Sequence, residues 1–207
     1  MYWKIASLLI FAIFCLWVWY ESKKSVKNMQ NDENAFWERE RQANNVRRKS
    51  LDGLEYITIP SDLPFDVCTE NDNIRGYISI IRELMDEKIV NLTGYSNTEL
   101  KLKYGTANIT ALSSYDQNYT SLVTTLQKWA DELLKLSKEE EAYRIMEFSV
   151  STKCDIKRTF VLVGKKYLEN GETDKYEELI SVAKELRSLN RSAIVLGLEE
   201  INSNQED

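Results

Sequence analysis

The chain has 207 residues, a formal net charge of −6 and no histidine. The absence of histidine excludes every His-dependent catalytic arrangement and removes the commonest metal ligand. Two prolines and seven glycines are few for a fold with many tight turns, so the composition favours helices over sheets. The three cysteines are widely spaced and form no C-x-x-C pair. Because Cys15 lies inside the apolar N-terminus, at most one bridge remains, Cys68 to Cys154.

The N-terminus has the character of a membrane anchor. No charge occurs from Ile5 to Tyr20. A helix of about 16–19 residues covers about 24–28 Å of a hydrocarbon core that is ~30 Å thick. We therefore expect a single transmembrane helix over residues 1–20, in contact with the lipid bilayer. The alternatives are a cleaved signal peptide, although no small-residue cleavage site follows the apolar run, and a buried core helix.

The charges around this segment predict which side of the membrane holds the body. Lys23, Lys24 and Lys27 follow the apolar run, whereas only Lys4 precedes it. The positive-inside rule then places the C-terminal domain of a single-pass protein in the cytoplasm. The body after residue 50 is acidic, which disfavours nucleic acid as a partner. Four N-x-[ST] sequons are acceptors for N-glycosylation only if the body lies outside the cytoplasm: Asn91, Asn108, Asn118 and Asn190.

The rest of the chain divides into three parts. Residues 21–72 are rich in polar and charged side chains and contain both prolines, Pro60 and Pro64, so we expect a juxtamembrane stalk or linker. Residues 73–201 carry the helical signal and form the expected domain. Residues 202–207 form an acidic tail.

Apolar residues recur every three or four positions through the predicted domain, which indicates amphipathic helices and an all-α fold. The expected helices cover about 73–89, 96–104, 109–136, 142–150, 160–169, 173–186 and 191–201. Gly105 and Gly171 are expected to end two of them.

Two stretches of this domain match when one is shifted by 34 residues. Phe160 then falls on Leu126, Gly164 on Ala130 and Tyr167 on Leu133, so large residues meet large and small meet small. This pattern, over about residues 123–190, resembles the tetratricopeptide repeat, a 34-residue helix–turn–helix. Tyr176 departs from it, because the family has alanine at that position. An unrelated, non-repeat helical bundle of unknown role remains the alternative.

The resemblance implies a small antiparallel helical stack, with residues 73–120 and 191–201 as caps at its two ends. It also implies that a protein or peptide partner binds on the concave face built from the first helix of each pair. The positions of this sequence that match that face are Gln127, Asp131, Lys135, Arg158, Val161 and Lys165. Arg158 and Lys165 could hold a carboxylate of the partner.

These observations favour a membrane-anchored adaptor or scaffold over an enzyme. The sequence has no phosphate-binding loop, no zinc-protease motif and no nucleophile elbow, and we expect no catalytic residue, no cofactor and no metal. A structural membrane subunit that self-associates is the second hypothesis, so a homo-oligomer is also allowed. Its anchor lacks G-x-x-x-G, the commonest helix-pairing motif.

Overall fold

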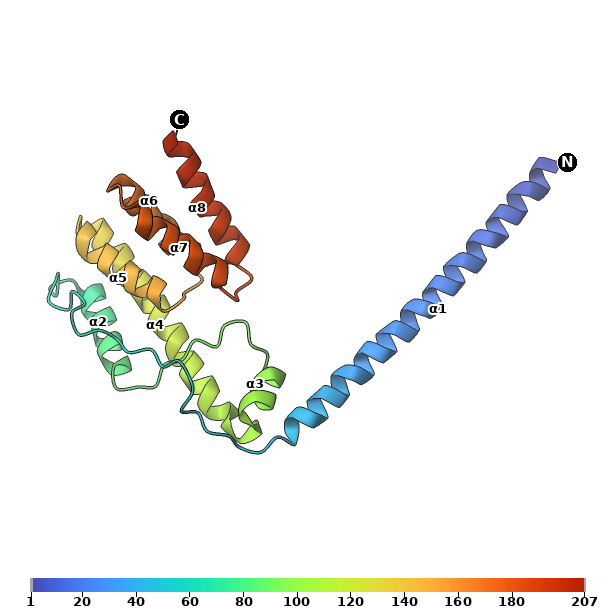
Figure 1. Ribbon diagram of the computed structural model, residues 1–207, viewed down its shortest axis with the longest axis horizontal. Helices are drawn as coiled ribbons and strands as arrows, with labels where there is room; N and C mark the ends of the chain where they lie inside the picture. Colours follow the sequence, from blue (N-terminus) through green and yellow to red (C-terminus); the bar gives the residue numbers. More distant parts are fainter. Residues whose placement is uncertain (1, 207) are drawn as a thin grey trace. The chain divides into compact units, whose positions relative to one another are not determined.

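The computed structural model describes the backbone of residues 2–206 and the side chains of residues 3, 11 and 13–203, and this described part is all-α. Its elements are α1 (Tyr2–Asn44), α2 (Asp72–Leu84), α3 (Asn97–Tyr104), the 3₁₀ turn η1 (Thr106–Asn108), α4 (Ile109–Lys135), α5 (Glu139–Ser151), α6 (Lys157–Glu169), α7 (Thr173–Glu185) and α8 (Arg191–Glu206) (Figure 1). From α3 onward the helices lie close to where the apolar spacing predicts them, whereas α2 ends at Leu84, five residues before the expected end at 89. Beyond it the chain is extended, where Ile89 O accepts a hydrogen bond of 2.9 Å from Ile57 N and Val90 pairs with Tyr56. The chain forms two compact units, which are described separately.

The N-terminal unit comprises Met1–Lys49 and Asn97–Ala107. α3 packs near the end of α1, where Lys101 makes an ion pair of 2.9 Å with Glu40 and Thr98 donates a hydrogen bond to the same carboxylate. Gly105 has a φ of +88°, and a Cβ there would lie 2.3 Å from the carbonyl oxygen of Arg47. Only glycine allows the chain to pass this closely.

The expected anchor, residues 1–20, lies in α1. The side chains of residues 1, 2, 4–10 and 12 are outside the described residues. Among the residues that are described, no helix has both the length and the apolar character needed to cross a bilayer.

The C-terminal unit comprises Ser50–Ser96 and Asn108–Asp207. α4 is its central element, because it packs against α5 on one flank and α2 on another. Its core stripe consists of Leu122, Leu126, Trp129 and Leu133, all fully buried and spaced by three or four residues. This spacing places one side chain per turn on the same face of the helix, so α4 buries a continuous apolar surface.

Residues 50–71, which the sequence suggested as part of a linker, run across the core of this unit. Ile59 and Leu63 are buried, and the Phe65 ring lies 5.5 Å from the Trp129 ring. Arg144 of α5 donates a hydrogen bond of 2.6 Å to the carbonyl of Asp62. This segment therefore covers the side of the α4–α5 pair.

The two helix pairs α4–α5 and α6–α7 have the same local geometry at an offset of 34 residues. α4 and α6 end at residues 135 and 169, and α5 and α7 begin at 139 and 173. Ser137 and Gly171 hold the same turn position with positive φ values of 57° and 73°. Both turns close with the same backbone bond, from Lys138 N to Leu133 O at 2.9 Å and from Glu172 N to Tyr167 O at 2.8 Å. α8 begins 34 residues after α6 and packs against it and α7.

Tyr176, the departure from the repeat pattern, is buried between α6, α7 and α8. Its hydroxyl donates a hydrogen bond of 2.5 Å to the carbonyl of Leu198 in α8. A Cβ on Gly164 would lie 3.2 Å from the Tyr176 ring and 2.8 Å from Leu198. Because Gly164 has no side chain, the large Tyr176 ring fits at a position where the repeat pattern has alanine.

All three cysteines are free, so the structure has no bridge between Cys68 and Cys154.

Candidate partner-binding face

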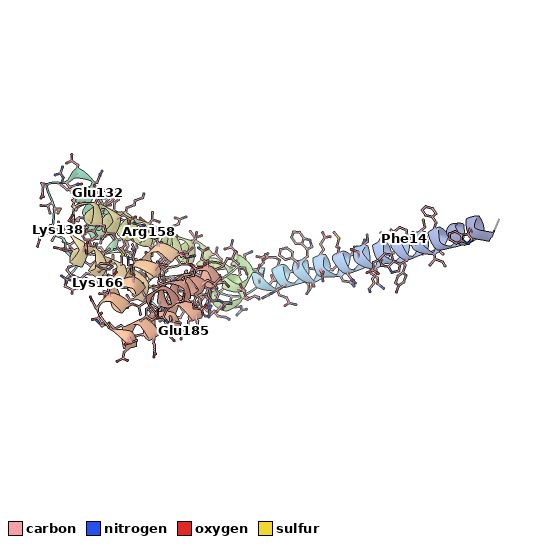
Figure 2. The ribbon with its side chains drawn as sticks, turned by 90° about the horizontal axis from the view of Figure 1, so that it is seen from above. Phe14, Glu132, Lys138, Arg158, Lys166 and Glu185 are labelled. Carbon is pink, nitrogen blue, oxygen red and sulfur yellow. The ribbon has the colours of Figure 1, made fainter. Side chains whose placement is uncertain are left out.

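The six predicted binding residues lie on two helices of the C-terminal unit. Gln127, Asp131 and Lys135 lie on α4, and the other three on α6. Figure 2 labels Arg158 among the side chains of this helical body. We call these six positions on α4 and α6 the partner face.

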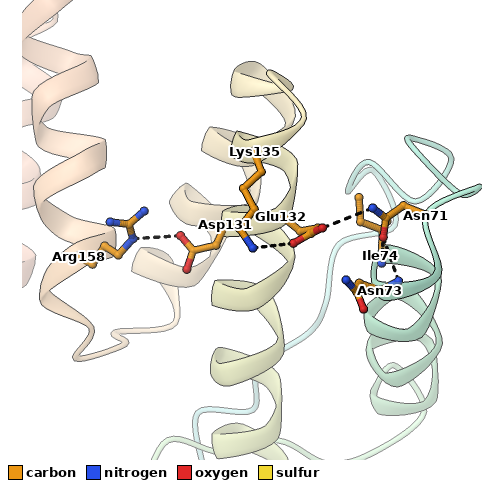
Figure 3. A network of polar contacts seen from close by, with 7 residues as sticks. All are labelled: Asn71, Asn73, Ile74, Asp131, Glu132, Lys135 and Arg158. Carbon is orange, nitrogen blue, oxygen red and sulfur yellow. Dashed lines mark hydrogen bonds and ion pairs between the residues drawn. The ribbon is translucent and has the colours of Figure 1, made fainter.

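Two predicted residues of α4 are joined to α6. Arg158 Nε contacts Asp131 Oδ1 at 3.0 Å (Figure 3), and Thr159 Oγ1 donates a hydrogen bond to Gln127 Oε1. Thr159 is 1% exposed, so the Gln127 bond is shielded from solvent. Gln127 therefore acts mainly as a link between the helices, and its Nε2 is buried without a hydrogen-bond partner among the described residues.

Arg158 remains accessible despite its pairing. Its side chain is 60% exposed and that of Asp131 is 32% exposed. Only the Nε contact joins the two in the described structure, so the two terminal amino groups of the guanidinium make no bond to Asp131 and can still form a bidentate bond to a carboxylate. An exposed pair of this kind contributes about 0–1 kcal/mol to stability, so a partner can compete for it.

Lys135 belongs to a network with α2. Its Nζ lies 2.9 Å from Glu132 Oε2, and Asn71 Nδ2 donates a bond of 3.4 Å to Glu132 Oε1 (Figure 3). The hydrogen bond from Lys135 holds the pKa of the Glu132 carboxyl below its usual value, against the opposing effect of partial burial. The Asn71 side chain also caps α2 by accepting bonds from the backbone N–H groups of Asn73 and Ile74.

Lys165 and Val161 complete the partner face on α6. Lys165 is 61% exposed and lies 3.6 Å from Glu169 one turn further along its own helix. Val161 is half-buried because α8 packs closely against it: a Cβ added to Gly197 of α8 would lie 3.1 Å from the Val161 side chain. The three cations of the partner face, Arg158, Lys165 and Lys135 (71% exposed), therefore combine high exposure with positive charge and contacts that a partner can replace, and Arg158 and Lys165 lie together on α6.

Sequence reasoning missed Thr159 and Glu132, which set the positions of two predicted residues. A signal for Thr159 was present, because Thr125 lies 34 residues earlier and is also buried. Threonines at the same repeat position indicate a small polar group that faces another helix. A signal for Glu132 was present as well, because it lies three residues before Lys135 on the same helix, a spacing that favours an ion pair.

No protein-family model, curated protein or solved structure matches the chain.

Proposed function

We propose that this protein is a membrane-anchored adaptor whose C-terminal unit binds a protein or peptide partner on the partner face, as a tetratricopeptide-like domain does. The observation that carries the proposal is the repeated helix–turn–helix geometry, in which the same turn recurs at Ser137 and Gly171. Stacked helix pairs leave the first helices side by side on one surface, and such surfaces serve as binding faces in repeat proteins.

The chemistry of the partner face favours a partner with carboxylate groups. Arg158 and Lys165 are cations on one helix, separated by seven residues, which is two turns or about 10 Å along the axis. An extended acidic segment can contact both. The acidic character of the body as a whole limits the attraction to this face, because like charges elsewhere repel such a partner.

The anchor and its orientation are part of the proposal and rest on the sequence of residues 1–20 and on Lys23, Lys24 and Lys27. Two sequons supply independent support for a cytoplasmic body. Asn108 is 1% exposed, and the amide of Asn91 donates hydrogen bonds to the Tyr119 hydroxyl and to the backbone carbonyls of Thr152 and Lys153. A glycan at either asparagine would block folding of this region, so the domain suits a compartment without N-glycosylation.

Partner capture tests the binding proposal. A photoreactive amino acid at Lys165 is expected to form an adduct with a distinct protein in intact membranes, whereas the same group at Lys184, exposed on α7, is not. The double variant R158Q and K165Q should lower capture about tenfold or more, because each charge-assisted bond contributes about 1.5–3 kcal/mol. The charge-matched control carries K184Q and R191Q. Equal adducts at both positions, or capture unchanged in the double variant, would reject the face.

Protease added to intact cells tests the orientation separately. We expect the C-terminal unit to be spared until the membrane is opened. Degradation from outside would overturn the cytoplasmic placement without bearing on the partner face.

A further inference from the structure

The C-terminal half of α1 has an exposed apolar stripe that neither the anchor nor the partner face explains. Val26, Met29, Phe36 and Trp37 are 54%, 67%, 53% and 56% exposed. Positions 22, 26, 29, 33, 36, 40 and 43 alternate by four and three residues, which is the spacing of a coiled-coil seam. The same spacing continues into the N-terminal part at 19 and 15. We call this line of positions the α1 seam.

One end of the α1 seam is already a packing surface. At positions 40 and 43 it meets α3, where Glu40 binds Lys101 and Thr98 and where Ala43 is fully buried. Towards the N-terminus the same stripe continues uncovered through Phe36, Met29 and Val26. The open part therefore extends an established interface in the same helical register.

The size of the open stripe matches an interface between two copies. Two aromatic side chains of roughly 150–250 Å² each, more than half exposed, together with a valine and a methionine expose roughly 400–500 Å² per chain. Pairing two copies would bury about twice this area, close to the ~1,000 Å² that a specific interface needs. Residues of the seam further towards the N-terminus would add to it, and Phe14 in that half also projects from α1 (Figure 2).

The charges favour a second copy over a lipid surface. Glu33 lies in the middle of the stripe, where anionic headgroups would repel it. At 100° per residue Lys24 and Lys27 fall on the other side of the helix. The flanks of the stripe carry the acidic Glu21 and Asp32 as well as the basic Lys23 and Arg39, whereas a helix that lies on a membrane has mainly basic residues flanking its apolar face.

The polar residues of the α1 seam are Ser22, Glu33 and Glu40, of which Glu40 is bound by α3. In a coiled coil, polar residues at seam positions specify register at a cost in stability. Trp37 Nε1 partly satisfies Glu33 with a hydrogen bond of 3.4 Å.

We propose that α1 pairs in parallel with α1 of a second copy of this chain along the α1 seam. The parallel direction rests on the proposed anchor, because two chains inserted in one bilayer with the same orientation present their helices side by side. Pairing then brings position 15 of one chain next to position 15 of the other, and position 29 next to position 29. It doubles the number of partner faces in each assembly and so raises avidity for a multivalent partner.

Cysteine crosslinking of the full chain in isolated membranes tests the pairing. The native Cys15, in a background with Cys68→Ser, should form a dimer under mild oxidation that thiol reductant reverses. In a background that also carries Cys15→Ala, Met29→Cys should form about fivefold more dimer than the matched control Asn31→Cys, which lies on the opposite side of the helix. Glu33→Leu should raise the dimer yield further, because it removes two facing carboxylates from the seam.

The outcomes separate pairing from anchoring. A yield at Met29→Cys no higher than at Asn31→Cys overturns the pairing. If the yields are equal and a lipid-borne quencher reduces the emission of a fluorophore attached at Met29→Cys, the stripe lies on the bilayer surface instead. Alkaline carbonate extraction of the same membranes tests the anchor alone: a chain that is extracted yet crosslinks at Met29→Cys retains the pairing and loses the anchor.

Discussion

Tyr176 offers the sharpest test of how the end of the stack is held. Its side chain is 3% exposed, its ring lies beside Gly164, and its hydroxyl bonds to the Leu198 carbonyl at 2.5 Å. Tyr176→Phe removes only that hydrogen bond, whereas Tyr176→Ala also removes the ring. The two variants therefore separate the contribution of the bond from that of packing.

The structure sets the expected magnitudes. The Leu198 carbonyl lies inside α8, where the helical bond from four residues later still satisfies it, so the hydroxyl contributes only about 0.5–1.5 kcal/mol. Deleting a buried aromatic ring leaves a cavity and costs about 3–5 kcal/mol. For a chain of this size, each 1 kcal/mol lowers the melting temperature by about 2–4 °C.

Thermal unfolding followed by circular dichroism gives these shifts, and hydrogen exchange locates them. In Tyr176→Ala we expect amides of α8 to exchange faster, with little change in α5, because α8 packs on α6 and α7 and not on α5. The reasoning fails if Tyr176→Ala costs less than about 1 kcal/mol, or if Tyr176→Phe costs as much. Either result would mean that the ring does not hold α8 in place.

Three further predictions test the turns, the core and the contact of α3 with α1. Positions 137 and 171 both hold a positive φ, where a Cβ is strained. Ser137→Gly should therefore raise the free energy of unfolding by about 0.5–1 kcal/mol, and Gly171→Ala should lower it by about 1 kcal/mol, as measured by urea titration. Equal effects of the same sign would contradict the shared turn. Burial raises the pKa of the Cys154 thiol, so iodoacetamide should label it only after unfolding, and rapid labelling of the native chain would show that the site is open. Hydrogen bonds from Thr98 and Lys101 hold the pKa of Glu40 below its ordinary value. The ionised carboxylate therefore stabilises the α1–α3 contact at neutral pH, and α3 amide protection, corrected for intrinsic rates, should fall as the pH drops through the depressed pKa of Glu40. Unchanged protection in acid would show that the carboxylate contributes nothing.

The sequence predicted the helices well because each one is encoded within its own residues. The spacing of Leu122, Leu126, Trp129 and Leu133 shows which face of α4 is buried before any neighbour is known. The turn at Gly171 and its partner at Ser137 were visible from the 34-residue offset. Membrane anchoring, the repeat family and the binding role remain predictions.

The partner face was less accessible to sequence reasoning. It identified Asp131 and Arg158 as surface positions but did not show that they pair with each other across α4 and α6. It also suggested a loose linker where Phe65 packs against Trp129. Such contacts join residues far apart in the chain, and no local pattern encodes them.

What the sequence alone determined is the order of the helices from α2 onward, the repeat of their turns and the apolar stripe of each, because backbone hydrogen bonding and side-chain sterics act over a few residues. Only the tertiary structure decided how Tyr176 fits beside Gly164 and which cations of the partner face are already engaged. These outcomes depend on which side chains different helices bring together, and that is settled by packing of the whole core.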